Sequence, residues 1–250
     1  MTVLDADVIA EAIRILETAA SERLPLKAIG GVAIRLRTPS VPPVLARSYQ
    51  DIDLVTERRR GADVARLLEG MGYRPNHEFN ALHGDRRLLF HDDEHERQVD
   101  VFVGAFAMCH AIPVAERLAL EPLTVPLAEL LLTKLQIVEL NDKDLRDAVT
   151  LLIGHAVAVG DGDAVNAARI ATLCGADWGL WRTVKQTLER VRASLGELGL
   201  DPADEGLALE RIGTLWDAIE AEPKRARWKL RARVGDRARW YDEPEETGAA

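Results

Sequence analysis

Cysteine and long apolar runs are both scarce in this sequence. Its 250 residues include only Cys109 and Cys174, too few for a disulfide framework or a zinc cage. The longest apolar stretch, around residues 149–159, is interrupted by His155 and falls short of the ~18 residues that span a bilayer. The opening MTVLDADVIAEAIR carries acids where a secretion signal needs basic residues and an apolar run. We therefore expect a cytoplasmic protein without a membrane partner.

Positive charge is also in short supply, except in one segment. The net charge of -9 argues against a protein that coats nucleic acid through general electrostatics. Residues 224–239, however, hold eight basic residues and the single acid Asp236, a net charge of +7. Trp228 and Trp240 accompany this basic segment and could stack on a base, although a place in the core is the more common role. The segment is the one hint of a polyanionic partner.

The pattern of the first half mixes helices and strands. Apolar residues at helical spacing predict an N-terminal helix, and the period-two run SYQDIDLV predicts a half-buried strand. A short strand ends at Gly30-Gly31, and the proline-rich TPSVPP that follows can be only a loop. The pattern also predicts an amphipathic helix at residues 61–70. It predicts strands at 86–90 and 98–103 that pair as a hairpin through a charged turn.

After Pro113 the pattern becomes almost wholly helical. The expected helices are 127–140, 143–155, 163–174, 181–195, 205–220 and the basic segment. The predicted fold class is therefore α+β, with a mixed-sheet domain at 1–112, an all-helical domain at 113–240 and a flexible tail at 241–250.

Acidic residues occur at regular positions in two of the predicted strands. Because residues two apart in a strand share a face, Asp51 and Asp53 place two carboxylates side by side. The apolar strand VDVFV supplies a third carboxylate, Asp100. Three carboxylates on neighbouring strands can hold Mg²⁺ and activate an attacking hydroxyl. The simpler alternative is that they are surface acids on a solvated face of the sheet.

A glycine pair lies twenty residues upstream of Asp51. Gly30 and Gly31, between a strand and a helix, would let the backbone approach a phosphate and direct amide groups at it. A plain tight turn would need the same residues.

In the order IGG, RSYQDIDLV and VDVFV, the sequence resembles the nucleotidyltransferase superfamily of polymerase-beta type. Within that superfamily it is most similar to AbiE-type toxin and aminoglycoside-type nucleotidyltransferases. The AbiE-type proteins carry an Arg-x-Ser-x-Asp-x-Asp block, to which Arg47, Ser48, Asp51 and Asp53 correspond, although Arg47 and Ser48 are adjacent here. They also carry a Thr-Lys followed by a Lys-Asp-x-x-Asp block, and this chain reads LLLTKLQ and NDKDLRD. The resemblance covers about residues 27–152.

The resemblance implies a role for each matched residue. Asp51 and Asp53 would bind Mg²⁺, with Mn²⁺ as the alternative ion, and Asp100 would join them and help to deprotonate the acceptor hydroxyl. The other residues implied in binding the nucleoside triphosphate are Gly30, Gly31, Arg35, Arg47, Ser48, Lys134, Asp144 and Asp147. Lys134 would meet the outer phosphates.

Each of these roles has a plainer alternative. Lys134 would otherwise be an exposed lysine on an amphipathic helix. Asp144 and Asp147, three apart on one helical face, could orient Lys134 or belong to a helix start capped near Asn141. Arginines such as Arg35 and Arg47 are commonly surface residues.

The implied activity is the transfer of a nucleoside monophosphate from a triphosphate to an acceptor hydroxyl, with release of pyrophosphate. The acceptor could be a tRNA end, an aminoglycoside-like small molecule or a protein, and the chain could be the toxin of a toxin–antitoxin pair. The alternative is a non-catalytic nucleotide- or partner-binding module on the same fold. A third hypothesis makes the basic segment the main functional surface, docking an antitoxin or a nucleic acid.

One other cluster could bind a metal. In HDDEHE, His91 and His95 are four residues apart, a spacing that can bind zinc on a helix. Between two predicted strands, the cluster is better interpreted as a charged turn.

Overall fold

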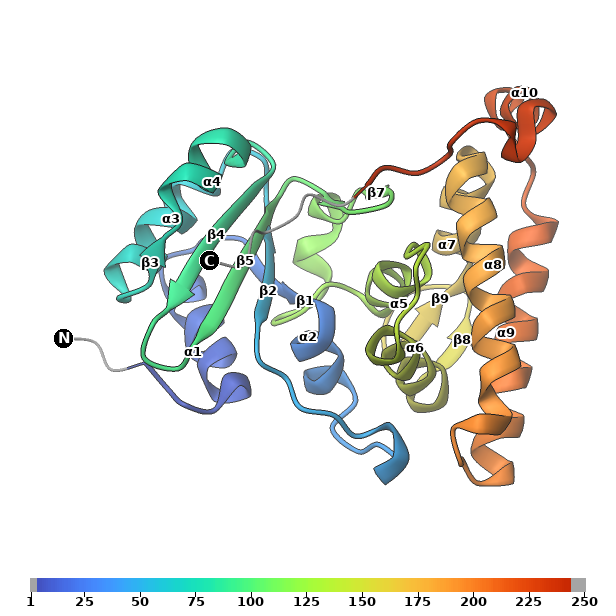
Figure 1. Cartoon of the computed structure of the whole chain (residues 1–250), viewed down its shortest axis with the longest axis horizontal. Coiled ribbons are helices and arrows are strands. Elements are labelled where there is room, and N and C mark those ends of the chain that lie inside the picture. Colours follow the sequence, from blue (N-terminus) through green and yellow to red (C-terminus); the bar gives the residue numbers. More distant parts are fainter. Residues whose placement is uncertain (1–3, 244–250) are drawn as a thin grey trace.

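In a computed structural model of the chain, which describes residues 4–243, five strands form one mixed sheet and most other elements are helices (Figure 1). The strand order is β1-β2-β5-β4-β3; β2 and β5 run parallel, and the other neighbours run antiparallel. The strands are β1 Leu26–Ile29, β2 Ile52–Thr56, β3 Arg74–Pro75, β4 Arg87–Asp92 and β5 Arg97–Val103. Two further pairs are β6 Phe106–Ala107 with β7 Ala111–Ile112, and β8 Ala156–Ala158 with β9 Ala164–Asn166.

The sheet separates an apolar face from a face that carries acids. Ile52 and Leu54 of β2 are fully buried, and so are Val99 and Val101, their partners on β5. Since side chains alternate along a strand, Asp53 and Asp100 project from the opposite face. The helices of this half are α1 Val8–Ser21, α2 Gly30–Arg37, α3 Gly61–Gly70 and α4 His77–His83.

The second half is a group of helices beside the sheet (Figure 1). They are α5 Leu127–Leu135, α6 Asp142–Gly154, α7 Ala167–Ala176, α8 Trp178–Ser194, α9 Pro202–Ala221 and α10 Ala226–Val234. Short 3-10 turns occur at η1 Pro43–Leu45, η2 Ala115–Leu120, η3 Leu195–Glu197 and η4 Gly235–Arg237. Four of the helices begin at a short polar residue whose side chain accepts backbone N–H groups of the first turn, which fixes where each helix starts. These capping residues are Asn141, Asn166, Asp177 and Asp201.

Helix α5 joins the two halves. All nine of its residues are buried, as expected for a helix that is covered on every side. Its buried Glu129 forms ion pairs with Arg117 and Arg169, at 2.8 and 2.9 Å. Burial raises the pKa of Glu129, and the two arginines compensate for the cost of burying its charge. Just before α5, the chain hydrogen-bonds along the edge of β1, where the Ala28 amide donates to the Leu123 carbonyl at 2.8 Å. This edge contact fixes α5 relative to the sheet.

The α+β class is confirmed, and so is the hairpin formed by β4 and β5. Several details differ from the prediction. The helix expected at 127–140 ends at Leu135, and the second half is largely rather than wholly helical, because β8 and β9 pair within it. The strand expected from residue 48 begins only at Ile52, because residues 48–51 make no ladder. Residues 164–166, expected within a helix, form β9, and α7 starts after the cap at Asn166. Helix α4 was not anticipated.

Two remaining expectations concern the chain as a whole. The division at residue 112 stays a prediction, and most of the expected tail at 241–250 lies outside the described residues. No helix within residues 4–243 has both the length and the apolar character needed to cross a membrane.

Candidate active site

Asp53 and Asp100 lie directly beside each other at the centre of the sheet. They are register partners on the parallel strands β2 and β5, so their side chains project from the same face. Ile29, the last residue of β1, pairs with Asp53 on its other side, so β1 delivers the glycine turn to this point. Strand register therefore brings together the glycine turn and two of the three predicted carboxylates.

Gly30 is in direct contact with Asp53. Its φ of +69° lies in the left-handed region that favours glycine, and a Cβ built at this position would lie 2.2 Å from Asp53 Oδ2. Gly30 is also the first residue of α2, and the N-cap residue Ile29 makes no side-chain cap hydrogen bond. The amide groups of the first turn of α2 therefore open beside the Asp53 carboxylate, an arrangement suited to binding an anion next to a cation.

Asp53 is a carboxylate without a protein partner. Within residues 4–243, no hydrogen bond or ion pair is formed by its side chain. Burial, followed by the negative charge of Asp100, raises the pKa of Asp53 to about 7, against the smaller opposing effects of Lys134 and Arg87. A cation bound at Asp53 would relieve both effects.

Asp100, in contrast, has a protein partner on each of its two oxygens. Arg87 Nε donates to its Oδ1 at 2.7 Å, and Gln98 Nε2 donates to its Oδ2 at 2.6 Å. Arg87 also lies over the rings of Phe79 and Phe102, at 5.7 and 5.1 Å from the centroids. The sequence analysis did not identify Arg87 or Gln98 as site residues. An arginine next to the apolar residues of RRLLF could have indicated Arg87, because a charged residue in a buried strand needs a partner.

Asp51 lies at the entrance to β2 and is exposed. Its Oδ1 accepts the backbone amide of Gln98 at 3.2 Å, which ties it to the start of β5. Asp51 is thus next to the site but outside the strand that was expected to align it with Asp53.

Arg47, Asp147, Lys134 and Asp144 form a charged network between the loop before β2 and helices α5 and α6. Arg47 donates to both oxygens of Asp147 at 2.8 and 2.7 Å. Lys134 Nζ lies 2.8 Å from Asp144 Oδ1 and 3.0 Å from Asp147 Oδ2. Burial lowers the pKa of Lys134, but the two aspartates outweigh it and the pKa ends above its ordinary value. Lys134 is therefore a buried cation, 8% exposed, rather than the exposed lysine of the plainer alternative.

The network also contacts the glycine turn. A Cβ built at Gly31 would lie 2.1 Å from Arg47 Nη2, so this glycine leaves room for the guanidinium. Arg47 stacks on Tyr49 with its Cζ 4.2 Å from the ring centroid. Tyr49 is a second residue that the motif did not include.

Arg35 and Ser48 lie at the margin of this arrangement. Arg35 donates to the Pro39 carbonyl and, with Arg47 and Tyr49, lines a hollow of about 700 Å³. Ser48 is exposed, and its carbonyl accepts from Arg47 at 3.2 Å. The structure thus groups Arg35, Arg47 and Tyr49 around one open space.

The donor set at Asp53 fits a divalent cation only in part. Asp51 and Asp53 offer the hard oxygen atoms that Mg²⁺ prefers, and Asp53 lacks any other partner. Across residues 4–243, no group of three or more metal-ligating side chains is close enough together to form a ready cage. Each oxygen of Asp100 accepts one hydrogen bond and keeps a further lone pair that could join the other two carboxylates at a cation.

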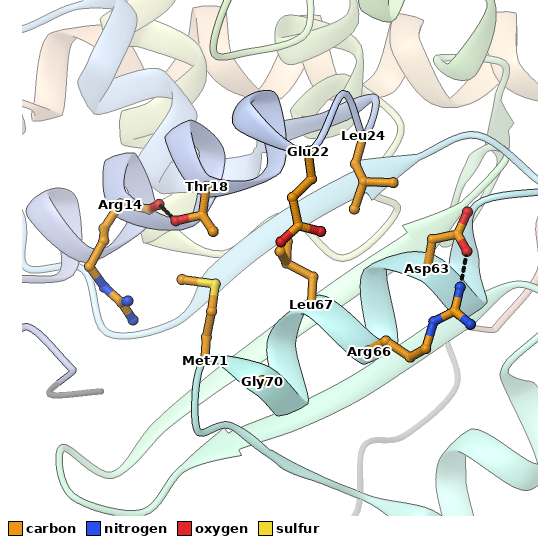
Figure 2. A pocket seen from close by; sticks show the side chains of 9 residues that line it. All are labelled: Arg14, Thr18, Glu22, Leu24, Asp63, Arg66, Leu67, Gly70 and Met71. Carbon is orange, nitrogen blue, oxygen red and sulfur yellow. Dashed lines mark hydrogen bonds and ion pairs between the residues drawn. The ribbon is translucent and has the colours of Figure 1, made fainter. Parts of the chain in front are cut away.

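Other sequence candidates lie elsewhere. His95 Nδ1 lies 2.9 Å from Asp92 Oδ2 in the turn after β4, as expected for a charged turn rather than a zinc site. A hollow of about 620 Å³ lies between α1 and α3. Figure 2 shows the side chains that line it, among them the ion pair of Asp63 and Arg66. None of the predicted site residues lines it.

Comparison with solved structures finds proteins of similar fold at low sequence identity. No family model and no curated protein sequence matches the chain. One similar solved structure is ANT(2″)-Ia in complex with adenylyl-2″-tobramycin, at 19% identity and a TM-score of 0.43, covering 57% of this chain and 86% of that one. Another is an antigenic nucleotidyltransferase-like protein from Paracoccidioides brasiliensis, at 14% identity and a TM-score of 0.42, covering 88% of this chain and 94% of that one.

Proposed function

We propose that this chain is a divalent-cation-dependent nucleotidyltransferase whose reaction centre is the Asp53 carboxylate. The observation that carries the proposal is the partnerless Asp53, beside Asp100 and in contact with Gly30 at the start of α2. A carboxylate with a pKa near 7 next to a turn of free amides suits a cation with bound phosphates better than it suits a structural role.

In this proposal, Asp51 and Asp53 would hold Mg²⁺, which would neutralise the phosphates and favour departure of pyrophosphate. The amide groups around Gly30 and Gly31 would bind phosphate oxygens, and Lys134 would contribute a fixed positive charge. Asp147 would position both Arg47 and Lys134, since it accepts hydrogen bonds from the two together.

The chemical step is attack by an acceptor hydroxyl oxygen on the α-phosphorus. One phosphorus–oxygen bond forms, the bond to pyrophosphate breaks, and the hydroxyl proton passes to a carboxylate. Asp100 is the proposed acceptor of that proton, and Arg87 would hold it in place. A tRNA end, an aminoglycoside-like molecule and a protein side chain all carry suitable nucleophiles.

One observation favours a second candidate, a nucleotide-binding module without turnover. Both oxygens of Asp100 accept hydrogen bonds from Arg87 and Gln98, as they would in a site that binds but does not react. Such a module would bind triphosphate and release no pyrophosphate.

The test is pyrophosphate release and label transfer from each of the nucleoside triphosphates, with Mg²⁺ and each class of acceptor. Wild type should transfer label to one class, and Asp53→Asn should lower the rate by at least about a hundredfold. Asp217→Asn, which neutralises an exposed acid on α9, is the matched control and should keep full activity. Equal transfer by wild type and Asp53→Asn would exclude the proposal. Binding without transfer would select the non-catalytic module.

A further inference from the structure

A separate hollow of about 770 Å³ lies where α10 and the residues after it fold back over the start of α8. None of the residues predicted for the nucleotide site lines it. Four aromatic residues contribute to its walls: Trp178, Trp228, Trp240 and Tyr241. Three arginines contribute as well: Arg227, Arg231 and Arg239. We call this site the aromatic–arginine pocket.

The aromatic rings of the pocket are held in fixed positions. Trp240 Nε1 donates to Thr183 Oγ1 at 3.1 Å, and the Asp242 amide donates to the Cys109 carbonyl at 3.0 Å. Trp240 also meets Trp178 and Tyr241 edge to face, with ring centroids 6.1 and 5.5 Å apart. Trp178 is buried, while Trp240 and Tyr241 are only half-buried. Arg182 and Arg239 lie over these two rings, 5.6 and 5.0 Å from the centroids, which leaves part of each ring open. Fixed rings with open surface are suited to stacking on a flat partner.

Within the described residues, two of the three lining arginines are engaged and Arg227 is available. Arg231 donates to the Gly235 and Ala238 carbonyls at 2.8 and 2.7 Å and lies 4.5 Å from the Trp178 ring centroid, so it belongs to the wall. Arg227 is exposed, and its side chain forms no ion pair with any residue of 4–243. Arg239 pairs with Glu243.

More free cations lie on α10 and in the residues that flank it, outside the lining of the pocket. Within the described part of the chain, Arg225, Lys229, Arg233 and Arg237 are likewise exposed and make no ion pair. The acids of the pocket are fewer. Asp177 is engaged as the cap of α8, where it accepts the Leu180 amide at 3.0 Å, and Asp242 is exposed. The pocket therefore sits in a positive field on an otherwise acidic protein.

We propose that the aromatic–arginine pocket binds single-stranded nucleic acid, with a base stacked on Trp240 and Tyr241 and the phosphates on the arginines of α10. Stacking on aromatic rings needs an unpaired base, and an arginine in the same lining can bind the phosphate attached to that base. An acidic peptide would satisfy the charges but would leave the rings without a flat partner. This binding does not depend on the proposed nucleotidyl transfer.

The first test is fluorescence anisotropy with labelled single-stranded RNA and DNA of mixed sequence, and with a duplex of the same sequence. Wild type should bind the single strands at low salt, bind the duplex at least about tenfold more weakly, and lose affinity as salt rises. Arg227→Glu should weaken single-strand binding by about tenfold and flatten the salt dependence. Arg192→Glu, the same change at an exposed arginine on the distant end of α8, should have little effect.

The second test separates stacking from folding. Trp240→Leu should weaken single-strand binding by about tenfold, while Trp240→Phe should restore most of it although it cannot donate to Thr183. Equal weakening by both variants would assign Trp240 a structural role and overturn the stacking proposal. The proposal would also be overturned if wild type did not bind, or if it bound the duplex as tightly as the single strand. The same holds if Arg192→Glu weakened binding as much as Arg227→Glu, or if poly-glutamate competed as strongly as the unlabelled oligonucleotide.

The same assay distinguishes nucleic-acid binding at the pocket from binding at the candidate active site. Asp53→Asn should bind the oligonucleotide as tightly as wild type, because Asp53 does not line the pocket. Loss of oligonucleotide binding in that variant would place the nucleic acid at the carboxylates and contradict the pocket proposal.

Discussion

The charge on Asp53 opposes folding of the metal-free protein. Its pKa in the folded chain, about 7, lies above the ordinary value of 3.8, so the folded state binds this proton more tightly than the unfolded state does. The contribution of Asp53 to stability therefore falls as pH rises between those two values, and the full penalty applies above about pH 7. A residue that opposes folding yet occupies the centre of the sheet is the expected signature of a functional group.

We expect Asp53→Asn to raise the free energy of unfolding at pH 8 by roughly 1–3 kcal/mol in the presence of EDTA. The gain should shrink toward about pH 4, where Asp53 is protonated in both states. Denaturant titration at the two pH values measures the difference, and Asp217→Asn serves as the control. A variant less stable than wild type at pH 8 would mean that the Asp53 carboxylate has a stabilising partner.

Gly30 should tolerate no side chain. The Cβ of Gly30→Ala would meet Asp53 Oδ2 at 2.2 Å, and the φ of +69° adds backbone strain, so we expect a loss of about 2–4 kcal/mol. Gly206→Ala is the matched control, because it lies exposed within α9 with no atom within 4 Å of the new Cβ. That change should stabilise the protein by about 0.5–1 kcal/mol. Thermal unfolding measures both changes. Equal melting temperatures for Gly30→Ala and Gly206→Ala would contradict this account.

At the scale of elements, the Arg47–Asp147 pair links the loop before β2 to α6. Its atoms lie 2.7–2.8 Å apart, and Asp147 is almost fully buried. We expect a double-mutant cycle with Arg47→Met and Asp147→Asn to give a coupling free energy of about 1–3 kcal/mol. The exposed pair Arg74–Asp93 has similar distances, and solvent should make its coupling much smaller. Equal couplings would show that burial does not strengthen the Arg47–Asp147 pair.

Element types were predictable from periodicity where an element is long and has one apolar face. The helices α1, α3, α6, α8 and α9 and the hairpin of β4 and β5 fall in this group. Short elements were not predictable, because three residues cannot display a period: β9 reads as the start of the helix that follows it. The pairing of Asp100 with Arg87 and Gln98 depends on cross-strand register, which no local pattern encodes.

At the scale of the whole molecule, the candidate site draws on both halves of the chain. Asp53 and Asp100 come from the sheet and Gly30 from the start of α2, whereas Lys134 and Asp147 come from α5 and α6. The motifs indicated these residues from the sequence. That Lys134 would be buried between two aspartates was not predictable, because it depends on how α5 packs against α6.

A ligand that contacts both halves should stabilise both. We expect MgATP, or the triphosphate that the site prefers, to raise the melting temperature of wild type in proportion to the logarithm of ligand concentration. Lys134→Met should reduce the shift, because the phosphates lose a fixed positive charge. Magnesium alone or triphosphate in EDTA should give a much smaller shift, and an equal shift with EDTA would show that binding does not need the cation.

The account rests on a divalent cation at Asp53. The most direct measurement is binding of Mn²⁺, followed by electron paramagnetic resonance, in the presence of a non-hydrolysable triphosphate. Wild type and Asp217→Asn should bind Mn²⁺ with the same affinity, and Asp53→Asn should bind it at least about tenfold more weakly. Equal affinity in Asp53→Asn and wild type would contradict the central claim.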